Sequence, residues 1–241
     1  MGDLEHWGWQ MLEDGSTAAF SQNTLLAAPS DVLHQLSDGD RKDLCGIGTV
    51  RQYKRGSFIF LAGAPSESVY VLRKGQIKVY QVSADGRQII LWFCFAGEVF
   101  GLAEAVHGGS DRVLNAQACD ECEVLCVPRS AFNVYAKCHG DAILVIMRVL
   151  ACRVRVLGDM LVNLVNDDVN TRITKLILRL SACYGIRIGQ EVHLNIRMTH
   201  QEIADMVGSS RQTVTKILGQ LQHDGLLSIR NRRIRIRSRE L

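Results

Sequence analysis

Polar side chains recur at regular spacing after residue 198, in a pattern suited to hydrogen bonding with another molecule. Thr199 and Glu202 have the spacing of a capping box, which predicts that a helix begins there. Gly208 can adopt the left-handed backbone of a tight turn, and a second helix should follow over 211–224. That helix would expose one edge of donors and acceptors, namely Arg211, Gln212, Thr215 and Lys216. Such side chains suit base edges and phosphates in the major groove of DNA.

The second helix has a predicted cap in front of it and a basic segment behind it. Ser209 and Ser210 should cap the helix, with Gln212 at capping-box spacing from Ser209. Alternating residues on both sides of 231–233 predict a β-hairpin, whose arginines are Arg230, Arg232, Arg233, Arg235, Arg237 and Arg239. We expect Arg232 and Arg233 to contact DNA phosphates. The alternative is a helical hairpin with no ligand, and the order of capped helix, glycine turn, polar-edged helix and basic hairpin disfavours it.

The charge of the chain is unevenly distributed. Residues 171–241 contain 13 Lys and Arg against 5 Asp and Glu, a net charge of +8. Residues 1–170 contain 15 Lys and Arg against 20 Asp and Glu, a net charge of −5. An acidic body with a basic end favours a polyanionic partner for that end, such as double-stranded DNA. A solvated charged surface would explain the charge alone equally well.

The cysteines raise the question of metal or redox chemistry. Cys119, Cys122 and Cys126 have the spacing C-x2-C-x3-C, and Cys138 follows them. The strand pattern over 121–127 places Cys122 and Cys126 about 13 Å apart on one face, at roughly 3.3 Å per residue. Thiolates that share a zinc ion lie within about 4 Å of one another. We therefore expect core thiols and no metal, with a metal or cluster site at Cys119, Cys122, Cys126 and Cys138 as the alternative.

Two differently patterned parts of the chain must position these residues. Residues 1–30 have no sustained period and are predicted to be poorly ordered, and a short helix is expected over 30–44. Over 49–127, short β-prone runs alternate with glycines, and Asp85-Gly86 is a hairpin signal. Many short strands with glycine turns predict an all-β barrel or jelly roll.

A long helix is predicted over 141–165, and it is apolar on two sides. One side can pack on the β-domain, while the other needs a second copy of the chain, as in a coiled coil. We therefore expect a homodimer whose interface includes Leu150, Val154, Leu157 and Leu161. The alternative is a core helix of a monomer. A further helix is expected over 171–184.

Several classes of protein are disfavoured by what the sequence lacks. Every apolar window of about 18 residues carries charge, so we expect no membrane span. The acidic N-terminus does not resemble a secretory signal, which predicts a cytoplasmic protein with reduced thiols. Phosphate loops, nucleophile elbows and H-E-x-x-H pairs are missing, so an enzyme carrying a regulatory β-domain is the less favoured alternative.

The order of elements over residues 31–237 resembles the family of the cyclic-AMP receptor protein and the fumarate-nitrate reduction regulator, the CRP/FNR family. The most specific segments are Phe58–Gly63, Val69–Val79, Gly97–Gly101 and Thr199–Leu227. The resemblance implies an α+β chain with a β-roll (a double-stranded β-helix or jelly roll) at 31–140, a dimerisation helix at 141–166 and a C-terminal winged helix-turn-helix at 167–241. It also implies a homodimeric transcription regulator that binds a pseudo-palindromic operator and RNA polymerase, under the control of an effector or signal at the β-roll.

The resemblance also assigns roles to residues of the predicted helix-turn-helix. It implies that Arg211, Gln212 and Lys216 read bases. It implies that the phosphate contacts come from Thr199, Gln201, Ser210 and Thr213. The family often has Glu at position 212 and Arg at position 200, where this chain has Gln212 and His200. Glutamine pairs well with adenine, so the usual operator of the family is not assumed.

For the effector, the resemblance implies a pocket that includes Gly101, Leu102, Arg112 and Val113. Arg112 matches a phosphate-binding arginine, or it is instead a surface residue paired with Asp111 or Glu104. Leu102 and Val113 replace the polar partners of a bound nucleotide, which disfavours cyclic AMP and leaves the effector unknown. Iron–sulfur members place cysteines in an N-terminal run that this chain lacks, and His107 and His139 are weak candidates for haem, so neither cofactor is favoured.

Overall fold

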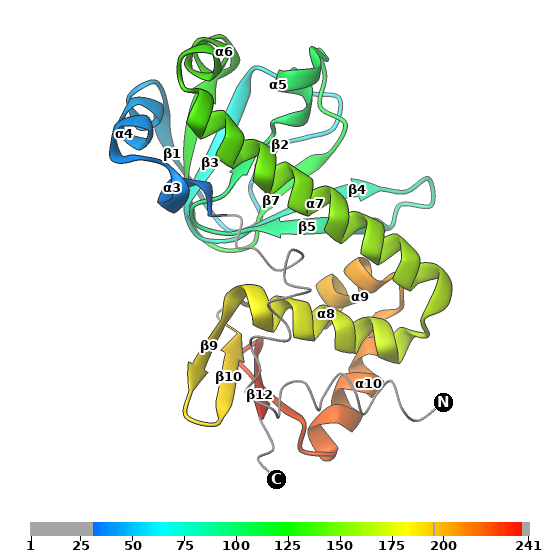
Figure 1. Cartoon of the computed structure of the whole chain (residues 1–241). Coiled ribbons are helices and arrows are strands. Elements are labelled where there is room, and N and C mark those ends of the chain that lie inside the picture. Colours follow the sequence, from blue (N-terminus) through cyan, green and yellow to red (C-terminus); the bar gives the residue numbers. More distant parts are fainter. Residues whose placement is uncertain (1–30, 195, 238–241) are drawn as a thin grey trace. The chain divides into compact units, whose positions relative to one another are not determined.

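A computed structural model describes residues 31–194 and 196–237 of the chain (Figure 1). Two compact units lie within these residues, one ending at Ala151 and the other beginning at Cys152. The segment predicted to be poorly ordered, 1–30, lies outside the described residues, and so does Arg239 of the predicted basic hairpin. Each unit is described by itself below.

The first unit contains two four-stranded antiparallel sheets, which confirms the β-roll expected from the glycine-punctuated runs. The first sheet has the strand order β1 (Thr49–Tyr53), β8 (Cys122–Pro128), β3 (Ser68–Lys74) and β6 (Val99–Phe100). The second has the order β2 (Phe58–Phe60), β7 (Asn115–Ala118), β4 (Ile77–Val82) and β5 (Gln88–Cys94). The turn predicted at Asp85-Gly86 joins β4 to β5, and Gly86 has the positive φ of 82° that such a turn requires.

Strand β8 is buried on both faces and joins two hydrophobic cores. Cys122, Val124 and Cys126 pack inside the roll, as the period of two along the strand predicted. Leu125 and Val127 point the other way, into a core shared with helices. The sheet formed by β1, β8, β3 and β6 therefore separates the interior of the roll from the helical layer.

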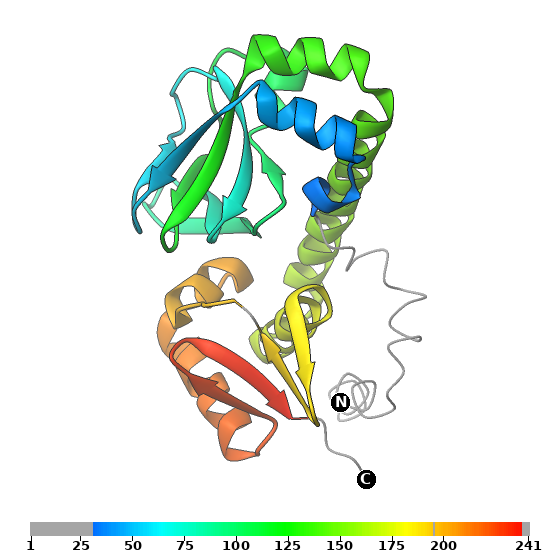
Figure 2. The ribbon, with the colours of Figure 1, turned by 90° about the vertical axis from the view of Figure 1, so that its left-hand side faces the viewer.

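Five helices contribute to the layer outside that sheet: α3 (Val32–Gln35), α4 (Asp38–Gly46), α5 (Ala103–His107), α6 (Arg129–Cys138) and the first turns of α7 (Gly140–Asn166). Figure 2 shows α4 and α6 on the same side of the roll. The single helix expected over 30–44 is in fact divided, because Leu36 is extended and Ser37 caps α4 by accepting from the Asp40 amide. Helix α6 and the short α5 (Ala103–His107) were not predicted.

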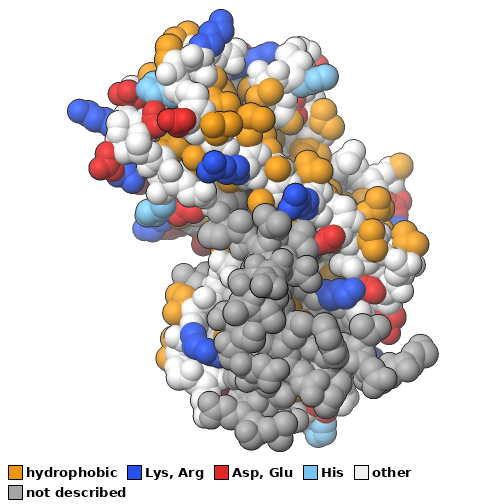
Figure 3. Space-filling view, in the orientation of Figure 1, with side chains coloured by type: hydrophobic (Ala, Val, Ile, Leu, Met, Phe, Trp, Pro, Cys, Tyr) orange, Lys and Arg blue, Asp and Glu red, His pale blue; other side chains and the backbone are white. Residues whose placement is uncertain are grey.

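Helix α7 has one buried and one exposed apolar row. The buried residues are Ala142, Val145, Ile146 and Val149, which pack in the helical layer. A second row is exposed in the single chain, and its members are Leu144, Met147, Ala151, Val154, Leu161 and Val165. Figure 3 shows hydrophobic side chains gathered along the course that α7 takes in Figure 1. None of the described helices is long and apolar enough to cross a membrane.

The second unit combines the later turns of α7 with further helices and a four-stranded sheet. The expected helix over 171–184 is α8 (Val169–Tyr184), which begins at the Asp168 cap. Its buried face contains Ile173, Leu176, Ile177 and Leu180. The other helices are α9 (His200–Val207) and α10 (Arg211–His223). The sheet has the order β11 (Leu227–Arg230), β12 (Arg233–Arg237), β10 (Glu191–Leu194) and β9 (Gly185–Ile188).

The β9–β10 hairpin is not among the elements expected from the sequence. The sequence signal for this hairpin is alternation on both sides of Gly189: Ile186 and Ile188 precede it, and Val192 and Leu194 follow it. Gly189 itself has a positive φ of 60°, as a tight turn requires.

The different burial of the cysteines predicts that their thiols react at different rates. Burial raises the pKa of the Cys122 thiol to about 12, with the Asp120 carboxylate as a second cause, whereas Cys138 is exposed. The thiolate is the reactive form, so iodoacetamide should label Cys138 first in the folded protein and leave Cys122 unlabelled. Peptide mapping by mass spectrometry measures this, and labelling in denaturant is the control. Equal labelling rates of Cys122 and Cys138 in the folded protein would show that Cys122 is not held in the core.

Candidate nucleic-acid interface

Helix α9 begins with the predicted capping box. The Thr199 hydroxyl accepts from the Glu202 amide at 3.1 Å, and Glu202 Oε2 accepts from the Thr199 amide at 2.8 Å. The helix ends at Gly208, whose φ of 64° is the left-handed conformation expected of a glycine there. A Cβ at Gly208 would also lie 3.2 Å from Cδ1 of Leu164, so the turn packs closely on the end of α7. These local signals fix the direction in which the second helix leaves the turn.

Helix α10 is capped by Ser210, whose hydroxyl accepts from the Thr213 amide at 3.1 Å. The predicted capping box between Ser209 and Gln212 is therefore wrong, because the helix is capped one residue later and Thr213 takes the third helical position. Gln212 is the second helical residue, and it is exposed. Its side chain is thus not needed for the cap and is available for other contacts.

The exposed edge of α10 is the predicted one. Val214, Leu218 and Leu221 are buried against the rest of the unit. The residues left exposed at the N-terminal end are Arg211, Gln212, Thr215 and Lys216. Gln212 and Lys216 are one helical turn apart, so they lie on the same side of the helix. The structure thus brings together the three residues expected to read bases.

His200 connects the two helices at this edge. Its Nδ1 lies 2.8 Å from the hydroxyl of Thr215, and that hydroxyl donates to the Arg211 carbonyl at 2.8 Å. Because the single hydroxyl proton is used for Arg211, His200 Nδ1 must be the donor to Thr215. The contact holds Thr215, in the middle of the exposed edge, against the start of α9. Sequence reasoning noted His200 only as a departure from the family and did not find this contact.

The phosphate contacts predicted for the two helices lie at the first turns of α9 and α10, where a helix N-terminus favours anions. Several of their side chains already have local partners. Thr199 donates to Glu202 Oε2 at 2.9 Å, and the hydroxyls of Ser210 and Thr213 are 2.8 Å apart. Gln201 is exposed and donates to Asp205 at 2.7 Å.

The basic hairpin of β11 and β12 is present, with a tighter turn than expected. Arg230 pairs with Arg233, so the turn contains only Asn231 and Arg232 and not three residues. Both turn residues have positive φ, 51° and 65°, which is the geometry of a two-residue turn that matches strand twist. The Arg232 carbonyl accepts from the Met198 amide at 3.1 Å, which ties the hairpin tip to the chain just before α9. The exposed arginines of the hairpin are Arg230, Arg232, Arg233 and Arg237.

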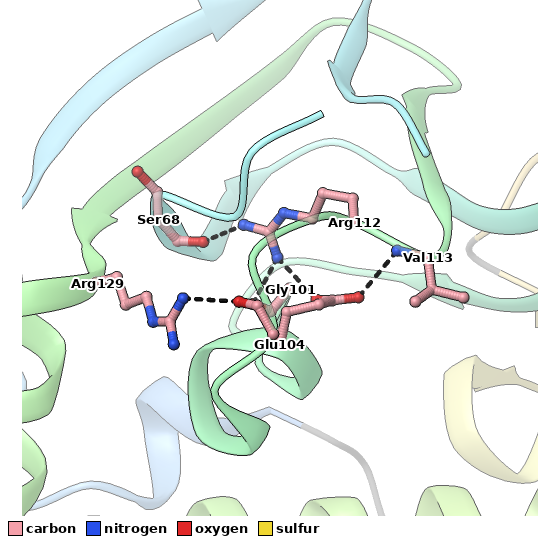
Figure 4. A network of polar contacts seen from close by, with 7 residues as sticks. Ser68, Gly101, Glu104, Arg112, Val113 and Arg129 are labelled. Atoms are coloured by element: carbon pink, nitrogen blue, oxygen red, sulfur yellow. Dashed lines mark hydrogen bonds and ion pairs between the residues drawn. The ribbon is translucent and has the colours of Figure 1, made fainter. Parts of the chain in front are cut away.

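The four residues expected at an effector pocket lie in the β-roll, but they do not all face one site. Arg112 Nη1 donates to the Gly101 carbonyl at 2.8 Å and lies 3.1 Å from Glu104 Oε2 (Figure 4). Leu102 is buried in the helical layer, and the Val113 side chain is exposed. The alternative of a surface arginine is wrong in one respect: Arg112 does pair with Glu104, but its side chain is fully buried.

The cysteines and histidines considered as ligands are dispersed. Cys122 and Cys126 are in the roll interior, Cys119 is half-buried and Cys138 is exposed. His107 is exposed, and His139 is 2.7 Å from Asp40 and stacks on Tyr135. Over 31–194 and 196–237, no group of three or more His, Cys, Asp or Glu side chains is arranged to hold a metal ion.

Both units match known domain families. Residues 50–137 match the family described as the cyclic nucleotide-binding domain, and residues 171–241 match the Crp-like helix-turn-helix domain.

Several known proteins are similar to most of the chain. The chain is 31% identical to the global nitrogen regulator of Synechocystis sp. over 78% of its own length and 84% of that protein. It is 28% identical to the CRP-like cAMP-activated global transcriptional regulator of Mycobacterium tuberculosis, over the same shares. Similar solved structures include FixK2 from Bradyrhizobium japonicum, with a TM-score of 0.66, 26% identity and coverage of 79% of this chain and 93% of that one. The fold is also that of the c-di-GMP-responsive global regulator CLP from Xanthomonas campestris, with a TM-score of 0.71, 22% identity and coverage of 84% and 100%.

With a nucleotide-binding-like β-roll, a Crp-like helix-turn-helix and relatives that are transcription regulators and not enzymes, the chain belongs to the CRP/FNR family of DNA-binding transcription regulators.

Proposed function

We propose that this regulator acts as a cytoplasmic homodimer that binds a pseudo-palindromic operator and works with RNA polymerase, with its operator affinity set by a signal at the β-roll. The observation that carries the proposal is the exposed polar edge of α10 beside the exposed arginines of the β11–β12 hairpin. Polar contacts to base edges supply specificity, and arginine contacts to phosphates supply much of the affinity.

Within the α10 edge, three side chains have the chemistry to choose a sequence. Arg211 and Lys216 can donate to the O6 and N7 acceptors of guanine, and Gln212 can pair with adenine through two hydrogen bonds. The N-terminal end of a recognition helix is the end that meets the bases in this class of domain. The contacts of His200 with Thr215 limit the movement of this edge and support a fixed set of contacts.

Dimerisation is supported by the exposed row of α7. Its positions 144, 147, 151, 154, 158, 161 and 165 alternate steps of three and four residues, which is the heptad spacing of a two-stranded coiled coil. Gly158 occupies one of these positions and would let two helices approach closely. Of the four predicted interface residues, Val154 and Leu161 are exposed in the single chain, and Leu150 and Leu157 are half-buried. A second copy of the chain would remove this apolar surface from water.

The alternative is a sensor that uses cysteines for redox or metal chemistry. It is less favoured, because burial raises the pKa of the Cys122 thiol to about 12 and keeps it protonated near neutral pH. Metal ligation and oxidation both need the thiolate.

Dimerisation through the exposed row of α7 can be tested by placing a charge in that row. Leu161→Lys should convert the protein to monomers and weaken operator binding strongly, because a charge would lie in the apolar seam and a single half-site binds weakly. Val134→Lys is the matched control, since Leu161 and Val134 are both 64% exposed and Val134 is on α6. Light scattering at micromolar concentration measures the mass. A monomeric wild type would contradict dimerisation through α7.

Phosphate binding by the basic hairpin can be tested by removing one charge from its turn. Arg232→Gly removes one charge and relieves the positive φ at that residue, so the free energy of unfolding should change by less than about 1 kcal/mol. Binding to all DNA sequences should weaken similarly, and the slope of log K against log salt should fall by about one unit. Arg87→Gln removes the same charge from an exposed turn of the β-roll and should leave the slope unchanged. An unchanged slope for Arg232→Gly would mean that this arginine does not contact phosphate.

Base reading by α10 can be tested at Gln212. Gln212→Glu should change the preferred base at one symmetric pair of operator positions, by about 1–3 kcal/mol, because glutamate accepts from cytosine and no longer pairs with adenine. Gln222→Glu makes the same charge change at an exposed site farther along α10 and should weaken all operators without changing their ranking. Affinities for every single-base operator variant decide the matter. An unaltered ranking for Gln212→Glu would leave specificity to Arg211, Lys216 and DNA shape.

A further inference from the structure

A buried ion pair in the β-roll joins α5, which carries Glu104, to Arg112 in the segment just before β7 (Figure 4). Arg112 Nη1 lies 3.1 Å from Glu104 Oε2, and the exposed fractions of the two side chains are 0% and 11%. Charged side chains are rarely buried to this degree unless each satisfies the other, because removal from water is costly.

The Glu104 carboxylate bridges two donors from consecutive residues. One oxygen accepts from Arg112, and the other, Oε1, accepts from the Val113 amide at 3.2 Å. A guanidinium and a backbone amide that converge on one carboxylate form a site for an oxyanion. Glu104 thus fills the place that the oxygens of a phosphate or carboxylate ligand would take.

The arginine is held in place without help from Glu104. Its guanidinium donates to the backbone carbonyls of Gly101 and Ser68, and it lies over the Phe60 ring at 4.4 Å from the ring centroid. The buried Nε has no hydrogen-bond partner among the described residues, so the group keeps an unused donor. A clamped guanidinium would remain in position as a donor if the carboxylate were removed.

We propose that Glu104 is an internal ligand of an oxyanion site formed by Arg112 and the Val113 amide, and that it excludes phosphate-bearing ligands from the β-roll. The proposal rests on the proposed role of the β-roll as the sensor, but it concerns ligand binding alone. A phosphate bound by the same two donors would lie against the carboxylate in a buried site, where like charges repel strongly. Such a ligand can enter only by displacing Glu104.

The test removes the internal ligand in the full-length protein and measures anion binding without DNA. Glu104→Ala leaves both donors and a vacant space, so cyclic AMP should bind about tenfold more tightly or better than to the wild type in titration calorimetry. Millimolar inorganic phosphate should raise the melting temperature of Glu104→Ala, but not that of the wild type, relative to chloride at equal ionic strength. Glu104→Gln removes the charge but keeps the volume, so it should gain affinity to a smaller extent.

Asp111→Asn is the matched control, because it removes one negative charge from an exposed residue next to Arg112 and should behave as the wild type. A folded Glu104→Ala protein with no gain in affinity would overturn the proposal, and so would tight cyclic AMP binding by the wild type. If Glu104→Ala does not fold, Glu104→Gln decides, since a lack of any gain there would also overturn it. Failure to bind an operator would contradict the proposed function and leave these anion-binding results valid.

Discussion

Helix α7 has two apolar rows, and a single chain buries only one of them. The row that includes Ala142 and Val149 completes the helical layer on the β-roll, while the row that includes Val154 and Leu161 is exposed to water. The proposed dimer follows from this constraint, because a second α7 would cover the row along its whole heptad spacing. Two-fold symmetry would then present two copies of α10 to DNA, and for this class of domain the half-sites lie about one helical turn apart.

The DNA-binding unit shows how a small number of local contacts can fix a reading surface. The capping box at Thr199, the left-handed Gly208 and the Ser210 cap set the path of the two helices, and burial of Val214 and Leu218 sets the rotation of α10. The hydrogen bond from the Met198 amide to the Arg232 carbonyl holds the basic turn of the hairpin next to the start of α9. The exposed donors therefore lie on backbone that is ordered by caps and core packing before any DNA is bound.

The parts of this structure that the sequence predicted are those with local or periodic signals. The helix-turn-helix has caps and a glycine turn, and β8 has a strict period of two that placed Cys122 and Cys126 on one face. The β9–β10 hairpin was missed because its glycines also end helices. Helix α6 was missed because it begins directly after β8, with Pro128 as the last residue of the strand. The burial of Arg112 depends on Phe60, Ser68 and Gly101, which are distant in sequence. Sequence spacing offered Glu104 as a partner but could not distinguish a surface pair from a buried one.

The proposed symmetric dimer reads a specific DNA sequence with α10. Selection of binding sites from a pool of random DNA duplexes by the wild-type protein tests this proposal most directly. We predict that the selected sequences converge on a pseudo-palindrome whose half-site centres are about 10 base pairs apart, or a multiple of that, and whose half-sites contain guanine and adenine positions suited to Arg211, Lys216 and Gln212. Convergence on a single asymmetric half-site would contradict the symmetric dimer, and no convergence at all would contradict sequence-specific binding.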